Sequence, residues 1–361
     1  MNAGRLGDLL GIALPVVQGP FGGGLSSVAL AVAVSEGGGL GSYGAHILEP
    51  QEIADLVGEL KARTSRPFAV NLWVPQQDEA GPWPDPAELA LHIRRLHPYY
   101  EELGLPAMAA EDVMSGPDFD AQVDALLEAV PPVISFVMGI PPQEVMDDTR
   151  RRGIKVIGTA TTVDEGVALE RAGVDAVVAS GADAGGHRGA FLRPIRESLV
   201  GTFSLVPQVA DAVSVPVIAA GGIADGRGMA AALALGADAV QIGTAFLATR
   251  ESGASGAHRR ALGSPEARTT VLTRLFTGRT ARGIVNRFVR DMTPYEETVP
   301  AYPVQSALMR SIRREAGTQG REDLSSLWAG QAAALAGGAH GARDYLSLLM
   351  DDFRARGGQG A

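Results

Sequence analysis

The sequence contains no cysteine, only two lysines (Lys61 and Lys155), and aromatic residues at 5% of its length. Without cysteine there is no disulfide framework, no thiolate metal site and no cysteine nucleophile, so redox chemistry requires a bound cofactor. With two lysines, anion binding has to rest on arginine, backbone N–H groups or helix N-termini. The same scarcity counts against a Schiff-base aldolase.

Long apolar runs and an excess of positive charge are also lacking. Residues 1–8 do not combine a basic start with an apolar run, as a signal peptide does, and no later uncharged stretch is long enough to span a membrane. The 31 Lys and Arg against 41 Asp and Glu give a formal charge of −10, which argues against nucleic acid or an anionic membrane as partner. We expect a cytoplasmic protein whose partner is a small-molecule substrate, with a homo-oligomer as an open alternative to a monomer.

Glycine is abundant, at 46 of 361 residues, and short Val- and Ile-rich runs alternate with stretches of helical spacing. This alternation is typical of βα units, and about eight of them predict an α/β fold, a (β/α)8 TIM barrel with a smaller, mainly helical cap domain. The predicted strands are Pro15–Gln18, Gly39–Ser42, Phe68–Leu72, Val133–Phe136, Lys155–Gly158, Asp175–Ala179, Pro216–Ala219 and Asp238–Ile242.

Two segments interrupt the βα alternation: residues 75–130, rich in Pro, aromatic and acidic residues, and the Arg-rich residues 245–320. Both segments would begin at the carboxyl ends of strands, which is the end where the mouth of a barrel lies. They therefore predict a lid over this mouth. The predicted domains are a barrel of residues 1–75 and 130–245, a helical cap of residues 76–129 and 246–320, and a C-terminal helix in residues 321–361 that packs on the barrel. The alternative is a doubly wound open sheet with a separate helical domain.

His187 is the leading catalytic candidate. It lies in Ala184-Gly185-Gly186-His187-Arg188-Gly189, directly after the sixth predicted strand. Paired glycines let backbone N–H groups approach a ligand, and an imidazole exchanges protons near neutral pH. A lone histidine is usually structural or exposed, but the glycines around this one favour catalysis. No other histidine has such a setting, and no pair has metal-ligand spacing, so no metal site is expected.

Other strand ends carry candidate binding residues. A glycine-rich turn, Gly19-Pro20-Phe21-Gly22, follows the first strand; it either brings the backbone close to a flat or anionic ligand or simply turns sharply. Asn71 ends the third strand, where its amide is either a ligand contact or a turn former.

Glycine loops also follow the last two predicted strands, at Gly221-Gly222 and at Gln241-Ile242-Gly243-Thr244. Barrels commonly bind phosphate at these two places. The later stretch Phe276–Ile284 has Arg279 and Arg282 three residues apart on a possible helix start, where structural salt bridging is the expected role.

Taken together, the motifs resemble the nitronate monooxygenase family, formerly called 2-nitropropane dioxygenases. The resemblance covers most of the chain and rests on these motifs: Gln18-Gly19-Pro20, Asn71-Leu72-Trp73-Val74-Pro75, Ser135-Phe136-Val137-Met138-Gly139-Ile140-Pro141, the Ala184–Gly189 run, Ala219–Gly228, Gln241–Thr244 and Thr277-Gly278-Arg279. It implies a TIM barrel with a helical domain, noncovalently bound FMN, and oxidation of alkyl nitronates by O2.

The resemblance also implies roles for individual residues. His187 would be the base that removes the α-proton of a nitroalkane, or a group that steadies the anionic nitronate. The implied cofactor-binding residues are Gly19, Pro20 and Phe21 behind the isoalloxazine, Asn71 and Ser180 near the ring, and Gly185, Gly186, Gly221, Gly222, Gln241, Gly243 and Thr244 at the ribityl chain and phosphate.

Three residues depart from the family pattern. Ser180 stands where the family usually has Gln, Val137 where a His often follows Ser-Phe, and Phe21 where Met is usual. The backbone and phosphate contacts are unaffected, so the departures bear on the substrate rather than on the cofactor. The alternatives are an FMN- and NAD(P)H-dependent enoyl or quinone reductase on the same barrel and, more distantly, a phosphate-ligand barrel or sensor without redox chemistry.

Overall fold

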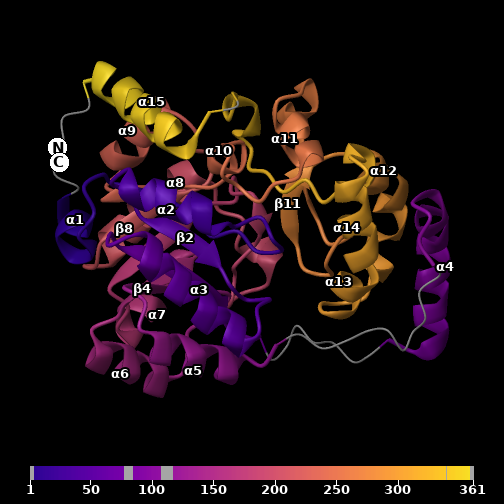
Figure 1. Cartoon of the computed structure of the whole chain (residues 1–361), viewed down its shortest axis with the longest axis horizontal. Coiled ribbons are helices and arrows are strands. Elements are labelled where there is room, and N and C mark those ends of the chain that lie inside the picture. The colour runs from indigo at the N-terminus through magenta and orange to yellow at the C-terminus, as the bar shows by residue number, and fades with distance from the viewer. Residues whose placement is uncertain (1–3, 77–83, 107–116, 339, 358–361) are drawn as a thin grey trace.

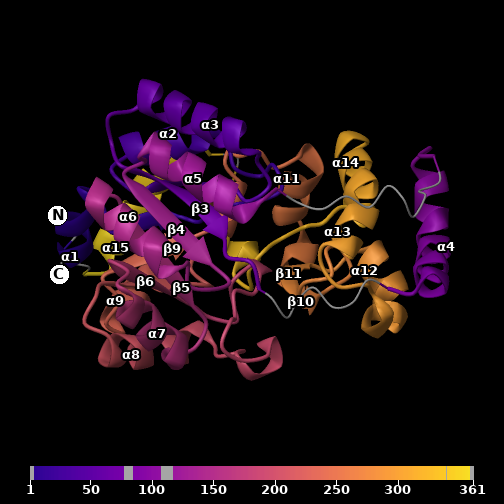
Figure 2. The same ribbon diagram turned by 90° about the horizontal axis from the view of Figure 1, so that it is seen from below.

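The computed structural model describes residues 4–76, 84–106, 117–338 and 340–357. Figure 1 shows a strand-and-helix barrel at one end of the molecule and a mainly helical cap at the other, with α4 furthest from the barrel. Figure 2 shows the same separation from below. No helix in the described ranges is long and apolar enough to cross a bilayer.

Eight parallel strands form the barrel. They are β1 (Val16–Gln18), β2 (Gly41–Gly44), β3 (Phe68–Trp73), β4 (Val133–Val137), β5 (Lys155–Ala160), β6 (Ala176–Ser180), β8 (Val217–Ala220) and β9 (Ala239–Ile242), hydrogen-bonded in the order β1-β9-β8-β6-β5-β4-β3-β2. A parallel bridge between Val17 and Leu40 joins the two end strands. The predicted TIM barrel is confirmed, and the open-sheet alternative is excluded.

Helices of the described residues surround the barrel, seven of them between successive strands and α15 after the last strand. They are α2 (Val28–Glu36), α3 (Pro50–Arg63), α5 (Phe119–Ala129), α6 (Gln143–Arg152), α7 (Val163–Ala172), α8 (Thr202–Ala212), α9 (Gly226–Ala234) and α15 (Ala342–Ala355). Their ends follow ordinary capping chemistry: in α7 the Thr162 side chain accepts from the Glu165 N–H, and Gly173 ends the helix in the left-handed region. These helices bury their apolar faces in one core with the strands.

The N-terminal helix α1 (Gly4–Leu10) closes the barrel at its end away from the cap (Figure 2). Its Leu6 and Leu10 pack with Ile12, Val17 and Leu40, and with inward-facing residues from the other strands. Because this end is filled with apolar side chains, a ligand has access to the barrel from the opposite, carboxyl-terminal ends of the strands.

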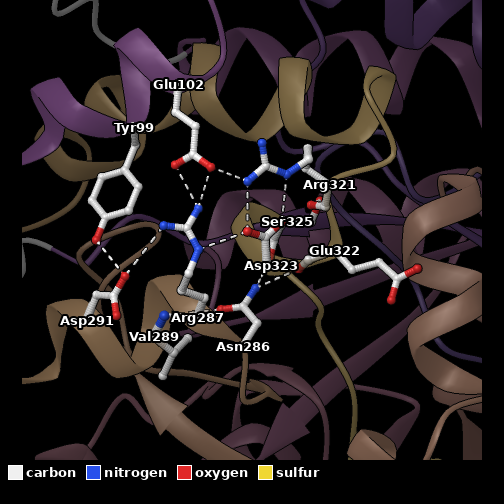
Figure 3. Close-up of polar contacts among 10 residues, drawn as sticks. All are labelled: Tyr99, Glu102, Asn286, Arg287, Val289, Asp291, Arg321, Glu322, Asp323 and Ser325. Atoms are coloured by element: carbon white, nitrogen blue, oxygen red, sulfur yellow. Dashed lines mark hydrogen bonds and ion pairs between the residues drawn. The ribbon is translucent and has the colours of Figure 1, made fainter.

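The cap contains α4 (Pro86–Glu102), α11 (Gly256–Leu262), α12 (Arg287–Met292), α13 (Val304–Leu308) and α14 (Arg310–Thr318), and α10 (Thr244–Leu247) lies directly after β9. Five short 3₁₀ segments, η2 (Ile195–Glu197), η3 (Pro265–Arg268), η4 (Thr293–Thr298), η5 (Glu322–Leu324) and η6 (Ala333–Leu335), complete the helical structure in the described residues. The cap has its own apolar core, which includes Leu96, Phe288 and Leu308. A charged network also fastens α4 to this core: Arg287 and Arg321 both bind Glu102 and Asp323 (Figure 3).

The two helices that the structure describes between residues 84 and 129 belong to different parts of the molecule. Helix α4 belongs to the cap core, whereas Val123, Leu126 and Leu127 of α5 are buried in the barrel core, where α5 packs against α3. Our expectation that residues 76–129 form the cap therefore needs correction at α5. The sequence did not separate the two helices because each has an apolar face of ordinary helical spacing.

The cap is also less helical than expected. Strands β10 (Thr270–Thr273) and β11 (Ala281–Ile284) form an antiparallel sheet with β7 (Gly186–His187), which comes from the loop after β6. The prediction of a helix start in Phe276–Ile284 is wrong, because Thr270–Thr273 and Ala281–Ile284 are two short runs around the turn at Gly278, where φ is +83°. The sheet ties the His187 segment directly to the cap.

Candidate functional site

One cavity of about 1000 Å3 opens at the carboxyl ends of the barrel strands and extends under the cap. All thirteen site residues predicted from the sequence line it: Gly19, Pro20, Phe21, Asn71, Ser180, Gly185, Gly186, His187, Gly221, Gly222, Gln241, Gly243 and Thr244. They come from the ends of β1, β3, β6, β8 and β9 and from β7. The barrel topology thus brings together residues that lie up to 225 positions apart.

His187 lies on a short strand rather than on a free loop. Its backbone pairs with Ala281, and the N–H of the next residue, Arg188, donates to the Thr280 carbonyl at 2.9 Å. The ring Nε2 is 2.9 Å from the Thr277 hydroxyl. Thr277 Oγ1 in turn donates to the Arg279 carbonyl at 3.1 Å. A hydroxyl has one hydrogen to donate, so Thr277 accepts from Nε2–H, which leaves Nδ1 of His187 as the basic nitrogen.

The protein holds His187 in its neutral form. Burial lowers the pKa of His187 well below the ordinary value of 6.5, and the neighbouring His46 ring and the positive charges of Arg279 and Arg313 lower it further. A neutral imidazole can accept a proton or a hydrogen bond, but it does not supply a fixed positive charge. The positive potential at this point comes from the nearby arginines instead.

Aromatic rings surround His187. Trp73 contacts it edge-on, with ring centroids 4.9 Å apart, and the Trp328 ring lies 5.4 Å away. Trp73 also stacks on His46, with ring centroids 3.6 Å apart. Burial and the charge of Arg279 lower the pKa of His46 to about 3, so it is neutral as well.

Arg279 lies against the same group of aromatic rings. Its guanidinium carbon is 4.3 Å from the Tyr302 ring centroid and 5.4 Å from that of Trp73. Its guanidinium also contacts Met138 Sδ at 2.9 Å. Arg282 donates to the Ala182 carbonyl at 3.0 Å and to Thr270. Arg279 therefore faces aromatic rings, and Arg282 binds the loop after β6. Neither contact is the salt bridge that we expected for these arginines.

Close backbone approaches explain several of the glycines that line the cavity. A Cβ on Gly221, where φ is +109°, would lie 2.7 Å from Thr202 Oγ1 and 2.9 Å from the Ala184 backbone nitrogen. Gly222 has φ +70°. A Cβ on Gly185 would lie 2.5 Å from the Gly330 backbone nitrogen. Only glycine fits such positions, and the loops therefore present bare backbone to the cavity.

Gly186 differs, because no atom lies within 4 Å of the Cβ that a side chain would add there, although φ is +74°. The loops after β1 and β9 also approach closely: a Cβ on Gly19 would come 3.3 Å from the Gly243 Cα. The Thr244 hydroxyl accepts from the Gly330 N–H at 2.9 Å and ties this region to the segment before η6.

Asn71 and Phe21 are held by their own neighbours. The Asn71 side-chain amide donates to the Ser135 carbonyl and to the Ser135 hydroxyl, both at 3.0 Å, which leaves its oxygen as the acceptor for a ligand. The Ser26 hydroxyl accepts from the Phe21 N–H at 3.1 Å and donates to the Phe21 carbonyl at 2.7 Å. Both candidates are thus pre-positioned at the cavity.

The three departures from the family pattern, Phe21, Val137 and Ser180, all line the cavity. Val137 fills space beside the His187 segment, since a Cβ on Gly189 would meet Val137 Cγ2 at 2.6 Å. The Ser180 carbonyl accepts from Arg188 at 3.0 Å. An apolar valine and a short serine make this part of the cavity less polar and wider than the usual His and Gln would.

Sequence reasoning did not single out several residues of this site, namely His46, Trp73, Thr277, Tyr302, Arg313 and Trp328. Thr277 and Trp73 did lie inside quoted motifs, so their signal was present without a role. His46, Tyr302 and Trp328 are isolated in the sequence and come together only through the fold.

The sequence pattern of the nitronate monooxygenase family matches residues 4–350. The chain belongs to the nitronate monooxygenase family. It is 40% identical to a "Probable nitronate monooxygenase" of Staphylococcus aureus strain JH9, and the match covers 98% of each chain. The family resemblance inferred from the motifs is thereby confirmed.

Two solved structures extend the comparison. A nitroalkane oxidase from Streptomyces ansochromogenes superposes with a TM-score of 0.87 at 39% identity, covering 97% of this chain and 98% of the other. FabK from Thermotoga maritima gives a TM-score of 0.75 at 32% identity, covering 98% and 96%. With its family membership, the chain is an oxidoreductase enzyme.

Proposed function

We propose that this nitronate monooxygenase family member binds FMN in the cavity and oxidises alkyl nitronates, or the parent nitroalkanes, with O2. The observation that carries the proposal is that thirteen residues predicted for this task all line one cavity at the active end of the barrel. The similarity to a nitroalkane oxidase along nearly the whole chain supports the reaction class.

The cavity fits a flavin mononucleotide in size and chemistry. Its volume of about 1000 Å3 accommodates the cofactor with space left for a substrate. Gly221, Gly222 and Gly243 would hold the phosphate through backbone N–H groups, as suits a chain with two lysines. Gly19, Pro20 and Phe21 would lie behind the ring, and the free Asn71 oxygen would accept from the ring's N–H edge.

The remaining predicted contacts complete this arrangement. Ser180 would lie near the ring, and Gly185, Gly186, Gln241 and Thr244 beside the ribityl chain and phosphate. The open space next to Gly186 Cα is consistent with a ligand passing there. The bound flavin would supply the acceptor for the substrate's electrons and their donor to oxygen, chemistry for which this cysteine-free chain needs a cofactor.

The protein's own part in the reaction centres on His187. With Nε2–H directed at Thr277, Nδ1 would accept the acidic α-proton of a neutral nitroalkane. The lowered pKa favours this role over that of a cationic anchor, because the ring is neutral before substrate binds. The nitronate anion formed by this transfer would raise the His187 pKa and stabilise the protonated ring beside it.

The electrostatics of the site favour an anionic substrate. The charges of Arg279 and Arg313 act on His187, so the potential there is positive in a chain whose net charge is −10. A nitronate is an anion, whereas an enone or quinone is neutral. This difference favours a nitronate as the compound that reacts beside His187, and the similarity to FabK keeps the NAD(P)H-dependent reductase as the alternative.

The purified protein's visible spectrum and its oxygen consumption test the proposal. We expect a yellow protein with about one FMN per chain that consumes O2 when ethyl nitronate is added without a nicotinamide. A colourless protein that FMN does not reconstitute would remove the cofactor assignment. A flavoprotein that takes up no oxygen with several nitronates would remove the substrate assignment alone.

A further inference from the structure

Three arginines of α14 line the part of the cavity under the cap. Arg310, Arg313 and Arg314 are spaced at i, i+3 and i+4, so they share one face of the helix, and Gly317 and Thr318 continue that face along the same cavity. Ile312 and Ala316 lie on the other face, buried in the cap core. The helix therefore packs through one side and presents its arginines to the cavity with the other.

No carboxylate neutralises these arginines within the described ranges. None of the three forms an ion pair there, and Glu49 is the one acidic residue among the described residues that line the cavity. Glu315, their neighbour on α14, instead accepts from Gln319. Arg313 donates to the Ser306 hydroxyl at 3.2 Å and to the Ser306 carbonyl at 3.1 Å, and both partners are uncharged.

The arrangement costs stability in the absence of an anion. Like charges at i, i+3 and i+4 on one helix face repel each other and destabilise the helix. Cations in the first turns also oppose the helix dipole. Burial and the charge of Arg310 lower the pKa of Arg313 to about 10, as expected for a cation without a countercharge.

We propose that this arginine face, Arg310, Arg313 and Arg314, binds the phosphoryl group of an organic substrate whose reacting part lies beside His187. Three guanidinium groups on adjacent turns match a group with two or more negative charges, whereas a single carboxylate is satisfied by one arginine. The hydroxyls of Ser255, Ser306 and Ser326 line the same cavity and supply further donors.

The arginine face is continuous with the reaction centre. Arg313 acts electrostatically on His187, and both line the same cavity. A simple nitroalkane would occupy little of a cavity of about 1000 Å3 that also reaches α14. The inference rests on the proposed function only because it places the reacting part of the substrate at His187. The positive charge of Arg310, Arg313 and Arg314 lacks a carboxylate partner among the described residues whether or not a flavin binds.

The direct test uses calorimetry to measure how tightly the purified holoenzyme binds inorganic pyrophosphate and ADP. The measurement is made at low and at high salt. We expect the R310Q/R314Q variant to bind both probes about tenfold or more weakly, and added salt to weaken binding to the wild type. The matched control is R268Q/R290Q, which removes two exposed cap arginines that do not line the cavity and should bind as the wild type does. The visible spectrum of each variant reports retained flavin.

Equal binding by R310Q/R314Q and the control, or no binding by the wild type, would overturn the inference. A protein without flavin that still binds pyrophosphate through Arg310 and Arg314 would contradict the proposed function and leave the arginine face intact. The source of the phosphoryl group follows from anaerobic mixing with NADH or NADPH. If the nicotinamide reduces the wild-type flavin and R310Q/R314Q slows this reduction, the bound phosphoryl group belongs to a dinucleotide. If neither NADH nor NADPH reduces the flavin, the phosphoryl group belongs to the oxidised substrate itself.

Discussion

His187 Nε2 and Thr277 Oγ1 lie 2.9 Å apart although ninety positions separate the two residues in the sequence. The contact is possible because β7 and β11 pair, which joins the loop after β6 to the cap. The cap therefore covers the barrel and also fixes the orientation of the candidate base.

Removing this contact should reduce catalysis without removing the base. We expect Thr277→Val to lower kcat on nitroethane by about tenfold to hundredfold, because a misdirected imidazole loses alignment with the α-proton. Thr277→Ser keeps the hydroxyl and should restore most of the rate. If Thr277→Val also leaves the pH profile of kcat/KM unshifted and the rate normal, Thr277 does not position His187.

Buried histidines should make the protein sensitive to acid. Burial, with the charge of Arg95, lowers the pKa of His92 in the cap core from 6.5 to about 4. Between these pH values the unfolded chain binds a proton that the folded chain does not, so the stabilising contribution is present above pH 6.5 and is lost as the pH falls toward 4.

As the pH falls through this window, the unfolding free energy of the wild type should decrease more steeply than that of His92→Gln. We expect the two slopes to differ by up to about 1.4 kcal/mol per pH unit. Urea unfolding at pH 6.5 and at pH 5 measures the difference. The control is His97→Gln, a change at a solvent-exposed histidine on the same helix. Identical pH slopes for wild type and His92→Gln would show that His92 is not held neutral.

The closely packed glycines that line the cavity, such as Gly221, should be required for flavin binding. Gly221→Ala places a Cβ 2.7 Å from Thr202 Oγ1 at a φ of +109°, so the loop has to move. We expect FMN affinity to fall by about tenfold or more, measured by fluorescence titration of the apoprotein. Gly153→Ala is the matched control: φ is +71° there, but no atom lies within 4 Å of the added Cβ and Gly153 does not line the cavity. Equal affinity in both variants would place the phosphate elsewhere.

The network around Glu102 should hold α4 on the cap. Arg321 and Arg287 lower the pKa of Glu102, and they lower that of Asp323 to about 2, so the network persists until the pH falls below the ordinary carboxylate range. Because these side chains are about one-third exposed, we expect Glu102→Gln to cost only about 0.5–1 kcal/mol of unfolding free energy.

Glu101→Gln is the control for this change, since Glu101 pairs with His97 on its own helix. Limited proteolysis should then cleave around α4 faster in Glu102→Gln than in Glu101→Gln. Equal rates would mean that apolar contacts such as those of Leu96 hold the helix without the ion pairs.

The barrel and its cavity were predictable from the sequence for a physical reason. Strands ending in glycine, such as Val217–Ala220 before Gly221, follow local rules, and the parallel topology then places all their carboxyl ends together. A residue known to end a strand is therefore also known to lie at the mouth. His187, Asn71 and Gly221 were located by this argument alone.

The cap was less predictable because its structure depends on pairing across long distances. Strand β11 has four residues and pairs with the two residues of β7, so neither carries a clear pattern of its own. The charge of Arg313 at the cavity and the stacking of His46 on Trp73 likewise appear only when the cap and barrel meet. Local propensity contains no information on such contacts.

The most direct test of the account is anaerobic mixing of the flavin-loaded enzyme with ethyl nitronate, with nitroethane and with NADH, while flavin absorbance is followed. We predict that both nitro compounds bleach the flavin without a nicotinamide, and that His187→Asn slows bleaching by nitroethane about a hundredfold or more while it affects bleaching by the preformed nitronate much less. Bleaching by NADH together with no reaction with either nitro compound would contradict nitronate oxidation and assign the site to a reductase.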